Sequence, residues 1–314
     1  MRNVTVFGGS GFLGRYLISR LVKGGDRVRA AVRDPAAASH LLPLGDVGQV
    51  QPVQANIRNA ASVRRAVGGA DVVVNLVGLL YQRGAQSFQA VHEDGAATIA
   101  AVAAEAGASR LLQVSAIGAA ADATSAYGRS KAAGEAAVRE HFPGATIVRP
   151  SIVFGPEDGF FNLFGMLASL SPVLPLIGGG HTRFQPVYVG DVADGIDALS
   201  RDPASAGATY EFGGGQVYSF RELMEMVCAQ TGRQRFLVPV PFALVKFDAA
   251  FLQLWPRPLL TMDQVELLKR DNVADGNCPG LDDLGIAPTP LEAVLPTYMH
   301  RYRRAGRLQP TEQA

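Results

Sequence analysis

The sequence predicts an α/β protein with a doubly wound parallel sheet, followed by a smaller α/β region. Apolar, β-branched runs alternate with helical patterns through the first half of the chain, which is typical of a parallel sheet covered by helices. The first run, Val4–Phe7, leads into closely spaced glycines and then into an amphipathic segment. After Pro150 the pattern changes, because Gly, Pro and Phe become frequent between Phe154 and Gly180.

The elements of the first half follow from local patterns. Short runs rich in Val, Ile and Leu predict buried strands, and longer segments with apolar residues on one face predict helices. We expect strands at Val4–Phe7, Val28–Val32, Val50–Val53, Val72–Leu76, Leu111–Val114 and Thr146–Val148, and helices at Phe12–Lys23, Ala60–Val67, Ala96–Ala106 and Ala126–His141.

The second half is less regular. Its clearest helical pattern has Leu223, Met226 and Val227 on one face. We expect strands at Phe184–Val189 and Tyr210–Phe212, and helices at Val192–Ser200, Phe220–Gln230 and Met262–Lys269.

The glycines after the first strand are spaced G-x-x-G-x-x-G. Gly8 would form the turn, Gly11 would let a ligand approach the backbone, and Gly14 would let the helix pack on the strand. A helix N-terminus with no side chain in the way suits a nucleotide diphosphate. The motif therefore predicts a dinucleotide-binding, Rossmann-type unit whose contacts come from Gly8, Gly9, Ser10, Gly11, Phe12, Leu13 and Gly14. A Gly-rich turn without a ligand is the alternative.

These patterns divide the chain in two. We expect residues 1–150 to form the dinucleotide-binding domain and residues 151–314 to form a smaller domain that faces a substrate or a partner. The segment 184–200 is expected to return to the first domain.

Composition excludes several classes of protein. A net charge of +1 provides no field that would favour nucleic acid. Cys228 and Cys278 show neither a disulfide framework nor a zinc pattern, and the five histidines lack metal-ligand spacing. The start of the chain enters a strand without a signal-peptide pattern, and Phe236–Leu260 is interrupted by Pro and charged residues, so no membrane span is expected. We expect a cytoplasmic protein, with attachment to the cytoplasmic face of an inner membrane left open.

The end of the second strand bears on the choice of nucleotide. Arg33 stands where an acidic residue would hold a ribose hydroxyl, and a guanidinium there suits a 2′-phosphate. Asp34 follows it, and Arg15 offers a second phosphate contact. We therefore favour NADP(H) over NAD(H), although an exposed loop arginine would have the same sequence.

Two further strand ends are candidates for cofactor contacts. Asn56 and Ile57 follow the third strand, where a chain usually lines the adenine. Val77 and Gly78 follow the fourth strand and should face the cofactor ribose.

Tyr127 and Lys131 form a Y-x-x-x-K pair on a predicted helix. A spacing of four places both side chains on one face. An ammonium one turn away should lower the phenol pKa, and the same lysine can hold the nicotinamide ribose. The pair is therefore suited to passing a proton to a carbonyl while a nicotinamide supplies hydride.

In these landmarks the chain resembles a short-chain dehydrogenase/reductase of the extended or atypical branch. The resemblance rests, in order, on the three glycines, Tyr127/Lys131, the segment from Arg149 through Pro150 to Pro156, and the segment from Gln185 to Ala193. It implies that Pro150 lies at the cofactor and that Asp191 is a structural landmark.

The resemblance also shows two departures. The family's catalytic hydroxyl follows the fifth strand, where Ser115 is the only hydroxyl here and Ala116 or Ile117 stands nearer the usual place. The family's asparagine in the fourth helix region is replaced around His92, which we expect to be an exposed loop-to-helix residue. The proton relay is therefore expected to be incomplete.

The C-terminal half narrows the resemblance. The segments Met262–Lys269, Pro279–Ile286 and Thr289–Glu292, with the apolar stretch Phe236–Leu260, make the chain similar to the NADP(H)-binding accessory subunits of respiratory complex I. That resemblance implies a tightly held, structural NADP(H), a peripheral position near the quinone site, and complex I subunits or quinone-biosynthesis proteins as partners.

Three functions remain open from the sequence. The first is this accessory or assembly role. The second is a working reductase, dehydrogenase or epimerase on a small carbonyl, nucleotide-sugar or isoprenoid substrate, with Tyr127, Lys131 and Ser115 as its catalytic residues. The third is a sensor of the NADPH/NADP⁺ ratio. The stretch Phe236–Leu260 either closes a pocket as core or presents an apolar patch, and the arginines Arg301, Arg303, Arg304 and Arg307 either meet an acidic surface or lie in solvent.

Overall fold

The computed structural model describes residues 1–246 and 261–304 and divides into two compact units. Unit 1 comprises Met1–Pro150, Val189–Phe212 and Asp275–Ile286. Unit 2 comprises Ser151–Tyr188, Gly213–Ala274 and Ala287–Ala314. Each unit has its own hydrophobic core.

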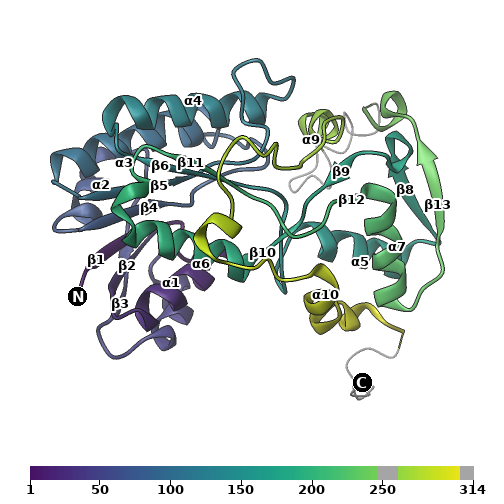
Figure 1. Cartoon of the computed structure of the whole chain (residues 1–314), viewed down its shortest axis with the longest axis horizontal. Coiled ribbons are helices and arrows are strands. Elements are labelled where there is room, and N and C mark those ends of the chain that lie inside the picture. The colour runs from purple at the N-terminus through teal and green to yellow at the C-terminus, as the bar shows by residue number, and fades with distance from the viewer. Residues whose placement is uncertain (247–260, 305–314) are drawn as a thin grey trace. The chain divides into compact units, whose positions relative to one another are not determined.

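Unit 1 is built on a seven-stranded sheet in which every pair is parallel (Figure 1). The strand order is β11-β6-β5-β4-β1-β2-β3, so the order reverses beside β1, where doubly wound sheets bind their ligands. This confirms the predicted fold class. The strands are β1 (Asn3–Phe7), β2 (Arg27–Val32), β3 (Val50–Gln54), β4 (Val72–Asn75), β5 (Arg110–Val114), β6 (Thr146–Pro150) and β11 (Thr209–Phe212).

Helices cover both faces of this sheet. Helices α2, α3 and α4 pack in sequence on one face, and α1 packs with α6 on the other (Figure 1). Because both faces are covered, the strands are almost continuously apolar, with Val73, Leu111 and Ile147 essentially inaccessible. The helices are α1 (Phe12–Lys23), α2 (Ala60–Val67), α3 (Asp94–Glu105), α4 (Ala126–His141) and α6 (Val189–Arg201).

Unit 2 holds short strands around a helical core. Phenylalanine rings of Phe154, Phe161, Phe164 and Phe220 pack edge to face within that core. Its elements are β7 (Val153–Phe154), α5 (Phe160–Leu170), β8 (Val173–Ile177), β9 (Arg183–Phe184), β10 (Val187–Tyr188), β12 (Tyr218–Ser219), α7 (Phe220–Thr231), β13 (Phe236–Val240), α9 (Met262–Leu267) and α10 (Leu291–Met299).

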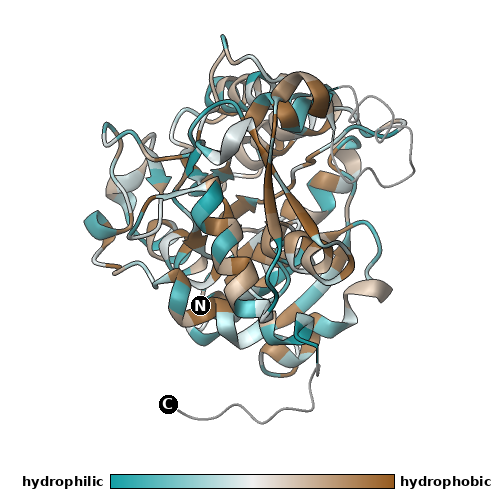
Figure 2. Cartoon of the chain, turned by 90° about the vertical axis from the view of Figure 1, so that its right-hand side faces the viewer, coloured by the Kyte–Doolittle hydropathy of each residue, from teal (hydrophilic) through white to brown (hydrophobic). Residues whose placement is uncertain are grey.

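A parallel two-stranded ribbon of β8 and β13 forms one side of unit 2. Figure 2 looks onto this side, and both strands are mostly apolar in its colouring. Within the described residues no helix is both long and apolar enough to span a bilayer.

Sequence patterns located most elements, with instructive exceptions. The single strand predicted at Phe184–Val189 is wrong: it is divided into β9 and β10, and α6 already begins at Val189. Pro186 separates the two strands, because it has no N–H to donate to a ladder. The patterns missed α5, β8, β13 and α10, and α10 carries Pro296 inside it.

Candidate functional site

The glycine turn joins β1 to α1 as the spacing predicts. Gly8 has φ +79°, a conformation that side chains disfavour, and its amide donates to the Ala31 carbonyl at 3.2 Å. The Gly11 amide closes the turn on the Gly8 carbonyl at 3.0 Å. The backbone at the end of β1 is therefore fixed against β2.

Gly14 is the position where helix and turn meet most closely. A Cβ built there would lie 2.5 Å from the Gly9 carbonyl oxygen and 2.6 Å from that of Gly8. Both obstacles are backbone atoms, which cannot rotate away. Only glycine lets the first turn of α1 rest directly on the loop.

The N-terminus of α1 is open to an anion. Gly11 is exposed and gives the helix no side-chain cap, and the first turn contains no acidic residue. The first N–H groups of a helix have no partner inside the helix, and the helix dipole makes this end positive. Exposed Ser10 and half-buried Phe12 and Leu13 line the same turn. This cradle fits the diphosphate of a dinucleotide.

The two residues after β2 that bear on the choice between NADP(H) and NAD(H), Arg33 and Asp34, have different contacts. Arg33 is exposed and forms no ion pair with any described residue. Asp34 instead uses its carboxylate on the backbone, accepting from the amides of Ala36 at 3.0 Å and Ala37 at 3.3 Å. Asp34 thus caps the 3-10 helix η1 (Ala36–Leu44), while the Arg33 guanidinium remains available.

The residues after β3 differ from each other in burial. Asn56 is half-buried, and its side-chain oxygen accepts from the Arg58 amide at 3.1 Å. Ile57 belongs to the core of unit 1 and packs tightly against Gly95. A contact of both residues with adenine stays a prediction.

A pair of buried amides, which sequence reasoning missed, organises the ends of β4 and β5. Asn75 donates to the Gln113 side-chain oxygen at 2.8 Å and accepts from the Val77 amide at 3.0 Å. Gln113 donates in turn to the Val114 carbonyl at 3.1 Å. The only sequence signal was a polar residue at the end of each apolar strand.

Lys131 and Tyr127 lie on one face of α4, whose N-cap is Ser125. Lys131 is buried and donates to the Val114 carbonyl at 3.1 Å, and its Nζ lies 6.0 Å from the centre of the Tyr127 ring. Burial lowers the pKa of Lys131 to about 8, against the opposing charge of Glu135. Lys131 therefore carries a charge at neutral pH and is close to losing it.

The expected lowering of the Tyr127 pKa is wrong. Burial raises the pKa of the phenol to about 12. Loss of hydration outweighs the attraction of an ammonium that faces the ring at 6.0 Å. Tyr127 is thus a neutral phenol at physiological pH.

Ser115 is buried at the end of β5, and its hydroxyl has no hydrogen-bond partner among the described residues. Its amide donates to the Val148 carbonyl at 2.7 Å, and that of Ile117 to the Pro150 carbonyl at 3.1 Å. Ile117 is itself 8 % exposed, and whether it or Ala116 stands nearer the usual place of the hydroxyl stays a prediction. Pro150 is buried at the end of β6.

The prediction that His92 is exposed is wrong. His92 is 3 % exposed and lies in a π-helical turn, η2 (Gln89–Glu93), ahead of α3. Its Nε2 accepts from the Leu79 amide at 2.9 Å, which places the ring proton on Nδ1, 2.8 Å from Ser130 Oγ. The Ser130 hydroxyl in turn donates a hydrogen bond to the Tyr127 carbonyl at 2.7 Å.

Burial among aromatic rings, and secondly a nearby positive charge, keep the His92 imidazole neutral. The ring stacks on Phe88 at 5.3 Å and meets Tyr127 edge to face at 5.5 Å. Burial, and secondly the charge of Lys131, lower the pKa of His92 to about 3. His92 therefore joins the loop after β4 to the helix that carries Tyr127 and Lys131 without bringing a charge.

A buried ion-pair network supports α4 from behind. Glu135 binds Arg149 with both oxygens, at 2.9 and 2.7 Å, and Arg149 reaches Glu211 at 3.5 Å. The Glu135 hydrogen bonds, foremost among the causes, raise the pKa of Arg149 above its ordinary value. Both carboxylates are almost fully buried, so removing Arg149 would leave two charges uncompensated.

Several predicted residues come together at the carboxyl edge of the sheet. A Cβ built on Gly8 would lie 3.4 Å from the Val77 amide nitrogen, and one on Gly78 would lie 3.7 Å from Lys131 Nζ and 3.8 Å from His92 Nε2. The glycine turn, the loop after β4 and the α4 pair therefore form one continuous surface. Among the described residues, no hydrogen bond or ion pair joins Arg33 or Asn56 to that surface.

Comparisons with known proteins agree with this geometry. Residues 8–159 match the NAD(P)H-binding family model. The chain is 38% identical over 314 residues to the Arabidopsis thaliana mitochondrial NADH dehydrogenase [ubiquinone] 1 alpha subcomplex subunit 9, covering 96% of this chain and 78% of the relative. A ceramide reductase of Caulobacter vibrioides is 32% identical over 253 residues, covering 80% and 78%.

A solved structure shares the fold. The dTDP-glucose 4,6-dehydratase of Streptomyces venezuelae, solved with NAD and TYD bound, superposes with a TM-score of 0.74 over 97% of this chain and 98% of that one. Its sequence identity is 22%, so this likeness speaks for the fold alone.

We predict that Gly14→Ala destabilises the protein by about 1–3 kcal/mol, because the new methyl group would collide with two backbone carbonyls. Gly68→Ala is the matched control, since its Cβ would meet nothing closer than 3.4 Å. Urea unfolding followed by circular dichroism measures both. Equal losses in the two variants would contradict the close approach.

We predict that His92 makes stability fall on acidification. Its folded pKa of about 3 lies below the ordinary value of 6.5, so only the unfolded chain takes up a proton between these values. The contribution is complete above pH 6.5, and about 2 kcal/mol should be lost between pH 6.5 and 5. Urea unfolding of His92→Gln across this range should lack that slope, and parallel curves for both proteins would refute it.

Proposed function

The chain belongs to the family of the NADH dehydrogenase [ubiquinone] 1 alpha subcomplex subunit 9 proteins, and on that premise we propose that it is an NADP(H)-holding accessory or assembly subunit of respiratory complex I. The observation that carries the proposal is the extent of the similarity, which covers 96% of the chain and so includes both units. The ceramide reductase is less similar, at 32% identity over 80% of the chain.

The residues of unit 1 suit a tightly held cofactor. NADP(H) would supply hydride chemistry wherever it turns over. The open N-terminus of α1 supports a diphosphate site, and the buried, charged Lys131 supports a contact with ribose hydroxyls. The holding residues would be Gly8, Gly9, Ser10, Gly11, Phe12, Leu13, Gly14, Arg33, Asn56, Ile57, Val77, Gly78, Tyr127, Lys131 and Pro150.

The preference for NADP(H) rests on the end of β2. Asp34 spends its carboxylate on the amides of η1, which leaves Arg33 as the group that can meet the adenosine ribose. A guanidinium binds a 2′-phosphate with two parallel hydrogen bonds. An uncharged ribose 2′-hydroxyl would gain much less binding free energy from a guanidinium.

The chemistry of the Tyr127/Lys131 pair suits a cofactor that is held for structural reasons better than one that is rapidly oxidised and reduced. Burial holds the Tyr127 phenol at a pKa of about 12, far from the neutral value that suits an acid–base group. Ile117 stands near the place where a polarising hydroxyl is expected. A ligand that binds only the folded chain stabilises it in any case.

The second candidate is an NADP(H)-dependent reductase. It is favoured by the Tyr127/Lys131 pair on one face of α4 and by the likeness to a ceramide reductase. In that role Tyr127 would move a proton at its phenol oxygen, Lys131 would hold the ribose, and the unpartnered Ser115 hydroxyl would orient a carbonyl. The substrate would be a small carbonyl, a nucleotide sugar or an isoprenoid.

We predict that Arg33→Ala weakens NADPH binding by about 10- to 100-fold and leaves NADH binding within about twofold, because one charge-assisted contact is lost. Titration calorimetry measures both affinities. Arg65→Ala, an exposed arginine on α2, is the control and should change neither. Equal weakening of both nucleotides would contradict selection by Arg33.

We predict that the tagged full chain, purified from its host, recovers complex I subunits. Tyr127→Phe should leave this recovery unchanged, because the proposed role needs no proton transfer. Quantitative mass spectrometry of the purified material measures recovery. Absence of every complex I subunit would refute the accessory role, and oxidation of bound NADPH by carbonyl compounds that Tyr127→Phe abolishes would support the reductase.

A further inference from the structure

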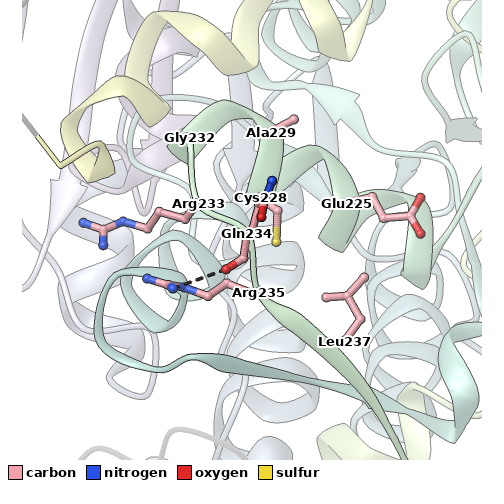
Figure 3. A pocket seen from close by; sticks show the side chains of 8 residues that line it. All are labelled: Glu225, Cys228, Ala229, Gly232, Arg233, Gln234, Arg235 and Leu237. Carbon is pink, nitrogen blue, oxygen red and sulfur yellow. Dashed lines mark hydrogen bonds between the residues drawn. The ribbon is translucent and has the colours of Figure 1, made fainter.

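A hollow in unit 2 is lined by residues other than the predicted site residues. Its volume is about 490 Å³, and it is formed by the end of α7 and the start of β13 (Figure 3). Cys228 and Leu237 provide apolar lining, and Arg233 and Arg235 provide charge. Glu225 also lines it, but its carboxylate points away from both guanidinium groups in Figure 3.

Three guanidinium groups near the hollow are anchored through Nε. Arg233 donates to the Tyr302 carbonyl at 3.0 Å, Arg235 to that of Ala168 at 2.7 Å, and Arg303 to that of Gln230 at 3.0 Å. None of the three forms an ion pair with a carboxylate of the described residues. Their orientation is therefore fixed while their charge is left without a counter-ion.

Capping explains only part of this arrangement. Ala168 and Gln230 lie in the last turns of α5 and α7, where arginines commonly satisfy carbonyls. That role uses the Nε proton. The outer N–H groups of each fork, which suit a carboxylate best, are not needed for it. One outer N–H group of Arg235 also donates to the Gln234 carbonyl at 3.3 Å (Figure 3), so the fork of Arg233 is the less occupied of the two.

Exposed apolar residues follow Arg235 on β13 and follow its carbonyl partner Ala168 on α5. Phe236 is 75% exposed and pairs in register with Val173 on β8, and Leu170 at the end of α5 is 78% exposed. Val238, two residues along β13, is 42% exposed. The same side carries the apolar strands visible in Figure 2. Contiguous exposed apolar groups of this kind mark interaction sites.

We propose that this combined surface docks a protein segment in which carboxylates flank apolar side chains. The inference rests on the proposed accessory role and names the surface and chemistry of the partner. Carboxylates would pair with the anchored forks of Arg233 and Arg235, and apolar side chains would cover Phe236 and its neighbours. Desolvated arginines beside aromatic groups are typical centres of protein interfaces.

The geometry favours a protein over a lipid surface. The Arg233 guanidinium, held by its Nε, presents two outer N–H groups in one direction, which selects a carboxylate at a defined position. Fluid headgroups gain little from such fixed directions. The partner would lie across the face and would not extend the ribbon, because Pro175 and Pro239 interrupt the hydrogen-bonding capacity of β8 and β13.

Photo-crosslinking tests the surface directly. A benzophenone amino acid at position 236 of the full chain, expressed in its host, should give one protein adduct whose linked peptide contains Asp or Glu beside apolar residues. The same group at Val217, which is 44% exposed elsewhere in unit 2, is the control and should not give it. A dimer of this chain, or no adduct beyond the control, would overturn the proposal.

A charge-reversal variant separates this surface from the proposed function. Arg233→Glu combined with Arg235→Glu should reduce recovery of the crosslinked partner by about tenfold or more. Retained NADPH binding by the double variant shows that the chain is still folded. Arg270→Glu, an exposed arginine of unit 2, is the control and should reduce neither. If wild type recovers complex I subunits and the double variant does so equally, the surface is wrong while the accessory role stands.

Two further outcomes are equally decisive. If wild type recovers no complex I subunit but position 236 still gives the acidic–apolar adduct, the accessory role fails and the surface stands. Flotation with phosphatidylcholine vesicles, with and without phosphatidylglycerol, covers the lipid alternative. Binding that needs phosphatidylglycerol and is lost in the double variant would overturn a protein partner.

Discussion

The close approach of α1 to the turn after β1 is the constraint on which unit 1 depends. Helix and turn meet at Gly14, where a methyl group would stand 2.5 Å from a backbone oxygen. This contact brings the positive end of the helix to the carboxyl edge of the sheet, beside the point where the strand order reverses. The loop after β4 and the face of α4 complete the same edge. A nucleotide site follows from backbone geometry before any side chain is considered.

Desolvation is the main cause of the pKa shifts of Tyr127, Lys131 and His92. Burial raises the pKa of Tyr127, lowers that of Lys131, and lowers that of His92 in addition to the effect of Lys131. Each shift favours the neutral form of its group. A bound nucleotide with its negative phosphates would favour the charged lysine instead. The site is thus organised by neutral contacts, of which the His92 bridge between Leu79 and Ser130 is the clearest.

Unit 2 has a different physical character. Its core is rich in phenylalanine, yet Phe236 and Leu170 remain largely exposed. The anchored Arg233 and Arg235 form no ion pair with a carboxylate in the described part of the chain. Exposed apolar side chains and unpaired arginines cost little free energy when a partner covers them. They therefore agree with an accessory role, in which unit 1 holds a nucleotide and unit 2 offers a surface.

The sequence by itself determined the class of fold, the elements of the sheet and the glycine turn, because strand and helix periods and the needs of a tight turn are local properties. It missed α5 and α10, where Phe-rich or Pro-containing segments hide the helical period. The role of Phe247, Trp255 and Arg307 in the apolar stretch and the basic tail lies outside the described residues. Only the tertiary structure decided that His92 is buried and neutral, that Asp34 caps η1, and that Asn75 meets Gln113. Burial and hydrogen-bond partners depend on residues distant in the chain, and no local pattern contains them.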